Sequence, residues 1–158
     1  MARRLLVSAF TVVATLVAAL ALSAAGASAA ELESPLHLAF QKTCPMLQCT
    51  GYLLDEDGGR LPHSSVIAHV TVGKVVGGIL PATAVETITY RRSSVTVDWT
   101  GIIDFNQLPT LIVMAGPVAG ATGHWKGLLG ASAHVSAQSV GGVITGLITI
   151  PRPEGEDG

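Results

Sequence analysis

Residues 116–150 read GPVAGATGHWKGLLGASAHVSAQSVGGVITGLITI, a stretch in which β-forming residues alternate with glycines. Val, Ile and Thr favour strands, whereas a glycine inside a strand permits a sharp bend or a close approach between backbones. Repeated glycines among β-formers therefore predict short, curved strands joined by tight turns. A small closed barrel requires curvature of this kind.

Earlier segments show the two-residue alternation typical of strands. Within residues 94–105, Val95, Val97 and Trp99 share one face. Residues 37–40 are either a first strand or part of an entry segment. Further strands are predicted at 50–54, 64–73, 85–90, 111–115, 122–129, 131–137 and 143–150. Seven or eight strands without a helical period predict an all-β fold, a single antiparallel barrel, with a two-sheet sandwich as the alternative.

The N-terminus has the pattern of an export signal. Arg3 and Arg4 precede an apolar run over residues 5–22, and Ala27-Ser28-Ala29 is a small-x-small cleavage pattern. The sequence therefore predicts a secretory signal peptide at residues 1–29 and a secreted protein without a stable membrane anchor. A retained anchor is the competing interpretation, and the choice between general and twin-arginine export stays open.

The remaining chain has the length of one domain. We expect an N-terminal segment with a short disulfide loop at 30–49, the barrel at 50–150 and a disordered tail at 151–158. Cleavage would remove Arg3 and Arg4 from the nine basic residues and none of the eleven acidic ones, leaving a net charge of −4. This charge argues against nucleic acid and anionic lipid surfaces as partners.

Both cysteines, Cys44 and Cys49, lie after the predicted cleavage point. Export places them in an oxidising compartment, so a disulfide is expected. A redox-active pair is the alternative, although the spacing is not Cys-x-x-Cys.

The run GPVAGATGHWKGLLG at Gly116–Gly130, followed by the strand to Ala137, resembles a pattern of the allene oxide cyclase and dirigent barrel superfamily. Ala121 stands where that family often has a second glycine, and Trp125 stands where it often has Tyr or Phe. The resemblance covers about a third of the chain after the signal and implies an eight-stranded, calycin-like barrel around an apolar cavity. It also implies association as a homodimer or homotrimer, and a cyclase or isomerase that acts on a natural product such as a polyketide or oxylipin without a cofactor.

Glu86 is the first candidate catalytic residue, because it shares a strand face with Ile88 and Tyr90. If that face points inward, Glu86 becomes an acid or base and Tyr90 a hydrogen-bond donor. The alternative places this face in solvent, with Val85 and Thr87 inside. Trp99 is expected to line the ligand site or pack in the core, and His124 with Trp125 to form a lid over the mouth or pack in a turn.

Other chemistries lack their motifs. No metal site is expected, because no two histidines have a suitable spacing; they are His37, His63, His69, His124 and His134. No Gly-x-Ser-x-Gly elbow and no phosphate-binding glycine loop is present, so a hydrolytic triad and nucleotide cofactors are not expected. Two functions remain open: a cofactor-independent cyclase or isomerase of a small hydrophobic molecule, or a non-catalytic carrier or self-associating structural barrel.

Overall fold

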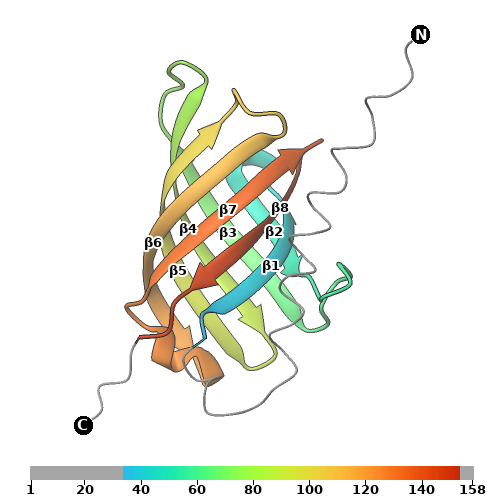
Figure 1. The fold of residues 1–158 in the computed structure, drawn as a ribbon, viewed down its shortest axis with the longest axis vertical. Coiled ribbons are helices and arrows are strands. Elements are labelled where there is room, and N and C mark those ends of the chain that lie inside the picture. Colours follow the sequence, from blue (N-terminus) through green and yellow to red (C-terminus); the bar gives the residue numbers. More distant parts are fainter. Residues whose placement is uncertain (1–33, 154–158) are drawn as a thin grey trace.

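A computed structural model describes residues 34–153, which form a closed barrel of eight antiparallel strands (Figure 1). Each strand pairs with the next in the chain, and β1 pairs with β8 to close the ring. The strands are β1 (Leu36–Thr43), β2 (Gln48–Leu53), β3 (Ser64–Val72), β4 (Ile79–Tyr90), β5 (Ser93–Asp104), β6 (Thr110–Thr122), β7 (Ser132–Val140) and β8 (Val143–Ile150). The predicted all-β closed barrel is therefore confirmed, and the sandwich alternative is wrong.

Of the two interpretations of residues 37–40, the first strand is confirmed. It starts at Leu36, so the barrel begins before residue 50, and residues 36–43 pair along their whole length with β8. The partner strand lies about a hundred residues away in sequence, so no local sequence pattern predicts this pairing. The predicted signal peptide at 1–29 and the tail residues 154–158 lie outside the described residues.

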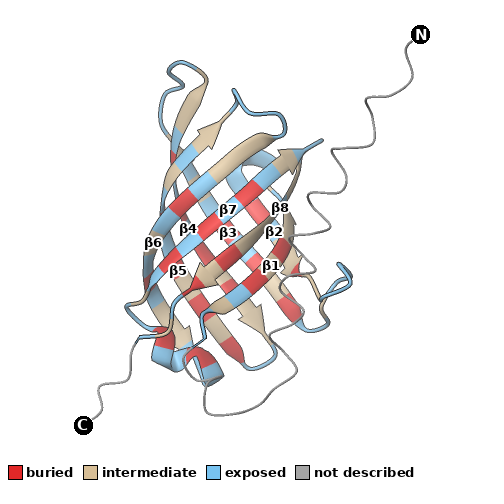
Figure 2. Cartoon of the chain, in the orientation of Figure 1, coloured by how far each residue is buried: buried red, intermediate tan, exposed pale blue. Residues whose placement is uncertain are grey.

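Alternating side chains divide each strand into an inner and an outer face, visible as alternating colours in Figure 2. On β5, Val95, Val97 and Trp99 are buried inside, as their shared face predicted. Large and small side chains complement one another across the strands: Phe40 stands opposite Gly146, and Trp99 opposite Ala84. This complementarity fills the interior without forcing side chains into one another.

Residues 122–129 were expected to be a strand, and this expectation is wrong. They contain the 3-10 helix η4 (Gly123–Leu128), which connects β6 to β7. The chain turns at Gly123, whose φ of 62° lies in the left-handed region that favours glycine. An added Cβ at that position would lie 2.5 Å from the Arg92 carbonyl oxygen.

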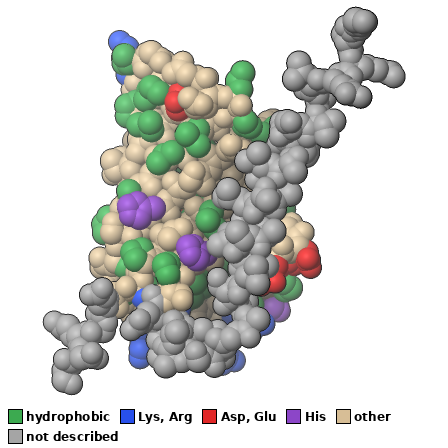
Figure 3. All heavy atoms as spheres, in the orientation of Figure 1, with side chains coloured by type: hydrophobic (Ala, Val, Ile, Leu, Met, Phe, Trp, Pro, Cys, Tyr) green, Lys and Arg blue, Asp and Glu red, His purple; other side chains and the backbone are tan. Residues whose placement is uncertain are grey.

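The two ends of the barrel differ in their connections. The η4 end carries η4, the β2–β3 and β4–β5 loops, the start of β1 and the end of β8. The disulfide end carries the loops β1–β2, with the 3-10 helix η3 (Pro45–Leu47), β3–β4, β5–β6 and β7–β8. In Figure 3, Lys and Arg side chains lie along the lower margin, where the η4 end lies, and also at the upper left corner, whereas apolar side chains are prominent towards the upper end.

The outer wall also exposes some apolar side chains. Residues 111–115 were expected to be buried on both faces or against another subunit. Met114 is buried inside, whereas Val113 points outward and is 43% exposed in the single chain. Neither of the two 3-10 helices in the described part is long and apolar enough to cross a membrane.

Candidate functional site

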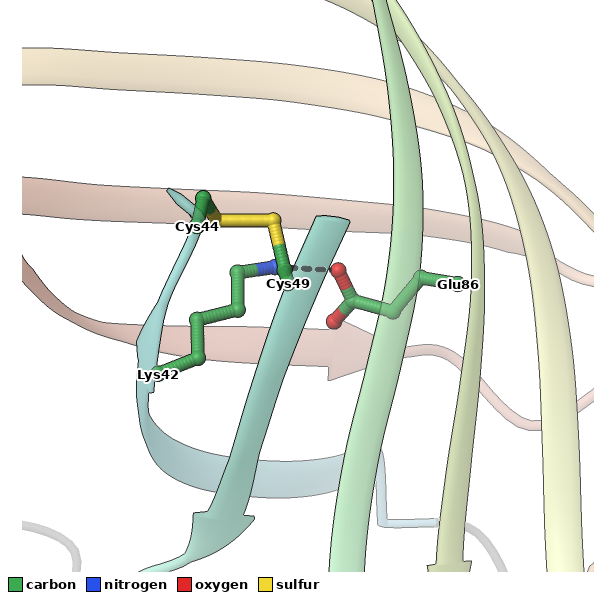
Figure 4. The surroundings of a disulfide bond; sticks show 4 residues. All are labelled: Lys42, Cys44, Cys49 and Glu86. Carbon is green, nitrogen blue, oxygen red and sulfur yellow. Dashed lines mark hydrogen bonds and ion pairs between the residues drawn. A yellow bond between two sulfur atoms is a disulfide. The ribbon is translucent and has the colours of Figure 1, made fainter. Parts of the chain in front are cut away.

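Two oppositely charged side chains meet inside the barrel. Lys42 on β1 forms an ion pair with Glu86 on β4, and their exposed fractions are 11% and 2%. Figure 4 shows the two side chains pointing toward one another near the disulfide, with the ion pair as a dashed line. The Lys42 Nζ also lies 4.9 Å from the centroid of the Phe40 ring, within cation–π range. Because burial of charges is unfavourable, their presence in an apolar core marks the candidate site.

Small residues leave room for this pair between β1 and β4. Lys42 is paired with Gly51 on β2, and Glu86 is paired with Ala68 on β3. An added Cβ at Gly51 would lie 2.1 Å from the Gln41 carbonyl oxygen and 2.5 Å from the Lys42 Cβ. Glycine is therefore required where β1 and β2 approach each other, and its lack of a side chain frees the space beside the lysine stem.

One oxygen of Glu86 has no partner. Oε2 contacts Lys42, whereas Oε1 is buried and accepts no hydrogen bond from any described residue. Nearly all buried polar atoms in proteins are paired, because an unpaired one loses its hydration without compensation. The unpaired oxygen is thus a buried hydrogen-bond acceptor with no donor among the described residues.

Trp99 borders the pair. Glu86 stands opposite Val97 on β5, and Trp99 is the next inward residue of that strand, toward the disulfide end. Cross-strand diagonal neighbours on one face lie within reach of aromatic side chains. The structure therefore brings Trp99 and Glu86 together on one inner wall, with the indole 3% exposed.

Tyr90 does not join this group. It shares the inner face of β4 with Glu86, but four residues of extended strand separate the two by roughly 13 Å. Tyr90 is half-buried at the η4 end, where the Arg91 guanidinium lies 5.1 Å from its ring centroid. Among the described residues, the charged partner of Glu86 is Lys42, which the sequence analysis did not name. The alternative that placed Val85 inside is wrong, since Val85 is 50% exposed.

His124 and Trp125 lie at the η4 end, away from the ion pair. Trp125 is buried with Leu128 against the core. The His124 side chain is exposed, and its backbone N–H donates a hydrogen bond of 3.0 Å to the Ser93 Oγ. The structure therefore places Trp125 as a plug of the η4 end.

The disulfide lies beside the candidate site. Cys44 and Cys49 are bonded, with 3.9 Å between their Cα atoms, which joins the end of β1 to the start of β2. Cys49 is buried and pairs with Ala68, which in turn pairs with Glu86. The predicted disulfide is confirmed, and it fixes the strand end that carries Lys42.

Sequence reasoning missed Lys42. Its signal was present, because Leu36, Leu38, Phe40 and Lys42 alternate along one strand and so share a face. A lysine on the same strand face as three apolar residues is a candidate buried charge once the strand is recognised.

A hollow lies on the outer surface, at the η4 end. It is an open surface groove of about 330 Å³ beside η4, bordered by Leu129, Ala131 and Arg152. It contains none of the predicted catalytic residues.

Comparisons with family models, curated protein sequences and solved structures find no match to this chain.

Proposed function

We propose that this protein is an exported, calycin-like barrel that binds a small, mostly apolar molecule beside Lys42 and Glu86 and cyclises or isomerises it without a cofactor. The observation that carries the proposal is the unpaired, buried Oε1 of Glu86 next to a paired lysine. The resemblance of residues 116–137 to allene oxide cyclase and dirigent barrels gives independent support for the class of reaction.

The local chemistry suits proton transfer within one molecule. Glu86 Oε1 would take a proton from one atom of the ligand and return it to another, so that the composition of the ligand does not change. The Lys42 ammonium would stabilise the negative charge that develops on a ligand oxygen in between. Trp99 and the apolar wall would hold the flexible remainder in one conformation, which lowers the entropic part of the barrier.

Access is proposed from the disulfide end. Lys42 retains 11% exposure there, and half-buried apolar residues surround the same end of the interior: Val70, Val72, Ile103, Ile112 and Ile144. The opposite end is plugged by Trp125 and Leu128. A ligand with one polar group and an apolar body matches this lining.

Export is part of the proposal. A disulfide-bonded cysteine pair is compatible with an extracellular protein. The predicted signal at 1–29 would bring the chain to such a compartment, and a homodimer or homotrimer is the expected assembly, with no nucleic acid partner.

A second candidate is a non-catalytic carrier or self-associating structural barrel. Dense packing of the interior favours it, because Phe40, Ile88 and Ile148 are completely buried and fill much of the barrel. Native mass spectrometry of protein purified from its source discriminates the two, since a carrier retains its ligand and an enzyme releases product.

The catalytic test uses linear polyketide or oxylipin precursors as probes. The protein should convert such a precursor faster than buffer does, and Glu86→Gln should slow this conversion by about 10²–10⁴-fold, the usual contribution of one acid–base group. Asp98→Asn is the matched control, because Asp98 is an exposed carboxylate on the outer face of β5. It should leave the rate unchanged.

Two further variants keep this test decisive. Trp99→Ala should slow conversion by disturbing ligand position. If Glu86→Gln does not fold, Lys42→Arg retains an ion pair while moving the positive charge, and should also lower the rate. Conversion that is equal in all folded variants, or absent for every precursor, would reject the enzyme proposal.

A further inference from the structure

Two loops at the disulfide end form one structural unit, here called the paired loop tip: residues 73–78 between β3 and β4, and residues 105–109 between β5 and β6. The Phe105 N–H donates to the Gly78 carbonyl oxygen at 2.9 Å. The Asn106 Nδ2 donates to the Gly77 carbonyl oxygen, also at 2.9 Å. These bonds hold the two loops together, and both extend beyond the ends of β7 and β8 at the top of Figure 1.

The paired loop tip exposes large apolar side chains. Val76 and Leu108 are 70% and 94% exposed, and Val75 and Phe105 are each 49% exposed. At the same end, Met46 and Leu47 of η3 and Val140 at the end of β7 are also exposed. Most exposed apolar side chains in proteins are scattered singly, whereas a cluster marks an interaction surface.

Charged side chains are few at the disulfide end and numerous at the η4 end. Among the described residues, the loops of the disulfide end carry one charged side chain, Lys74, with Asp104 at the end of β5 beside them. Asp104 accepts a hydrogen bond from the Asn106 backbone N–H at 2.9 Å. The η4 end carries eight: Asp55, Glu56, Asp57, Arg60, Arg91, Arg92, Lys126 and Arg152.

We propose that the paired loop tip is a membrane-docking surface that inserts reversibly into the outer part of a lipid bilayer. A nearly neutral, apolar projection is compatible with the interior of a bilayer, where unpaired charges are unfavourable. A second copy of the chain is a poorer occupant. Four apolar side chains on two narrow loops do not supply the roughly 800 Å² per partner that a stable protein interface buries.

The proposed attachment is reversible and therefore differs from a membrane anchor. It does not depend on the chemistry proposed for Lys42 and Glu86. Attachment comes from apolar side chains, so anionic headgroups are not required, in agreement with the negative net charge. The surface lies at the end from which we propose ligand access. Docking would therefore bring the barrel interior close to molecules dissolved in the bilayer.

Vesicle flotation tests the proposal with a chain of residues 30–158. This chain contains every strand of the closed barrel and lacks the apolar run at 5–22, which would bind lipid by itself. We expect it to float with phosphatidylcholine vesicles, equally at low and high salt. Val76→Asp and Leu108→Asp should each lower the bound fraction at least about tenfold, because a charge then replaces an inserted apolar group.

Leu129→Asp is the matched control. Leu129 is 60% exposed but lies at the η4 end, so this substitution should change binding less than about twofold. No flotation of the unaltered chain, or an equal loss in all three variants, would overturn the proposal. Binding that requires anionic lipid and disappears in salt would also overturn it, because it would be electrostatic.

A fluorescence experiment tests insertion itself. Phe105→Trp adds an indole at the paired loop tip, whereas the native Trp99 and Trp125 are buried within the barrel. Brominated lipid should quench the added emission and leave that of the unaltered chain unchanged. Unquenched emission would contradict insertion. Sedimentation velocity completes the test, because a dimer that Leu108→Asp dissociates would assign the surface to a second copy instead.

Discussion

The two ends of this barrel place apolar and charged groups in opposite ways. At the η4 end, Trp125 and Leu128 are inside and charged side chains surround the loops outside. At the disulfide end, a charged pair, Lys42 and Glu86, lies inside, whereas the loops expose valine, phenylalanine and leucine.

We propose that this difference separates two tasks within one topology: support of the fold at the η4 end and binding at the disulfide end. The η4 end follows the ordinary rule of burial, in which apolar groups leave water and charges stay in it. The disulfide end departs from that rule both inside and outside. A buried charge or an exposed apolar side chain reduces the stability of the fold unless another interaction compensates. Such residues therefore indicate where a ligand or another surface is expected to contact the protein.

Removal of the plug should have the largest effect on stability. Trp125→Ala deletes a buried indole, and truncation of a buried aromatic side chain typically destabilises a domain by about 3–5 kcal/mol. Urea unfolding monitored by circular dichroism measures the change. His124→Ala, an exposed neighbour in the same turn, is the control and should change the free energy of unfolding by no more than about 0.5 kcal/mol. A small effect of Trp125→Ala would mean that η4 does not support the barrel.

Separation of the charged pair should have the next largest effect. Lys42→Met leaves the Glu86 carboxylate buried without a partner, and we expect a loss of about 3 kcal/mol in the free energy of unfolding. The double variant Lys42→Met with Glu86→Leu should recover most or all of that loss, because an apolar pair needs no hydration. Chemical denaturation of both variants and of Glu86→Leu completes a double-mutant cycle.

This cycle sharpens the contrast between the ends. Recovery in the double variant, combined with loss of ligand conversion, would indicate a pair retained for function at the expense of stability. A double variant as unstable as Lys42→Met would instead give the pair a structural role, and the two ends would then differ less than proposed.

Local patterns predicted the parts of the fold that local physics determines. Alternation along β5 predicted its inner face correctly, because Val95, Val97 and Trp99 repeat with the period of the strand itself. The two cysteines are five residues apart, so their bond was also a local inference.

Long-range features were not predictable in this way. The pairing of β1 with β8 joins distant segments, and without it Lys42 had no assigned face. The orientation of Glu86 stayed open for the same reason, since either face of β4 contains residues suited to a core. Residues 122–129 were mistaken for a strand because their β-formers outweighed the turn at Gly123, where the chain adopts a positive φ.

The smallest change in stability is expected from the disulfide. Cys44→Ser with Cys49→Ala opens a ring of only six residues, and the loop-closure relation gives a loss of about 2 kcal/mol for such a short ring. Alanine at position 49 avoids a buried hydroxyl where Cys49 is 1% exposed. Because the bond joins β1 to β2 beside Lys42, hydrogen exchange should accelerate in residues 40–53 and remain unchanged around η4. Equal acceleration at both ends would show that the barrel opens as one cooperative unit. The two ends would then have the same local stability.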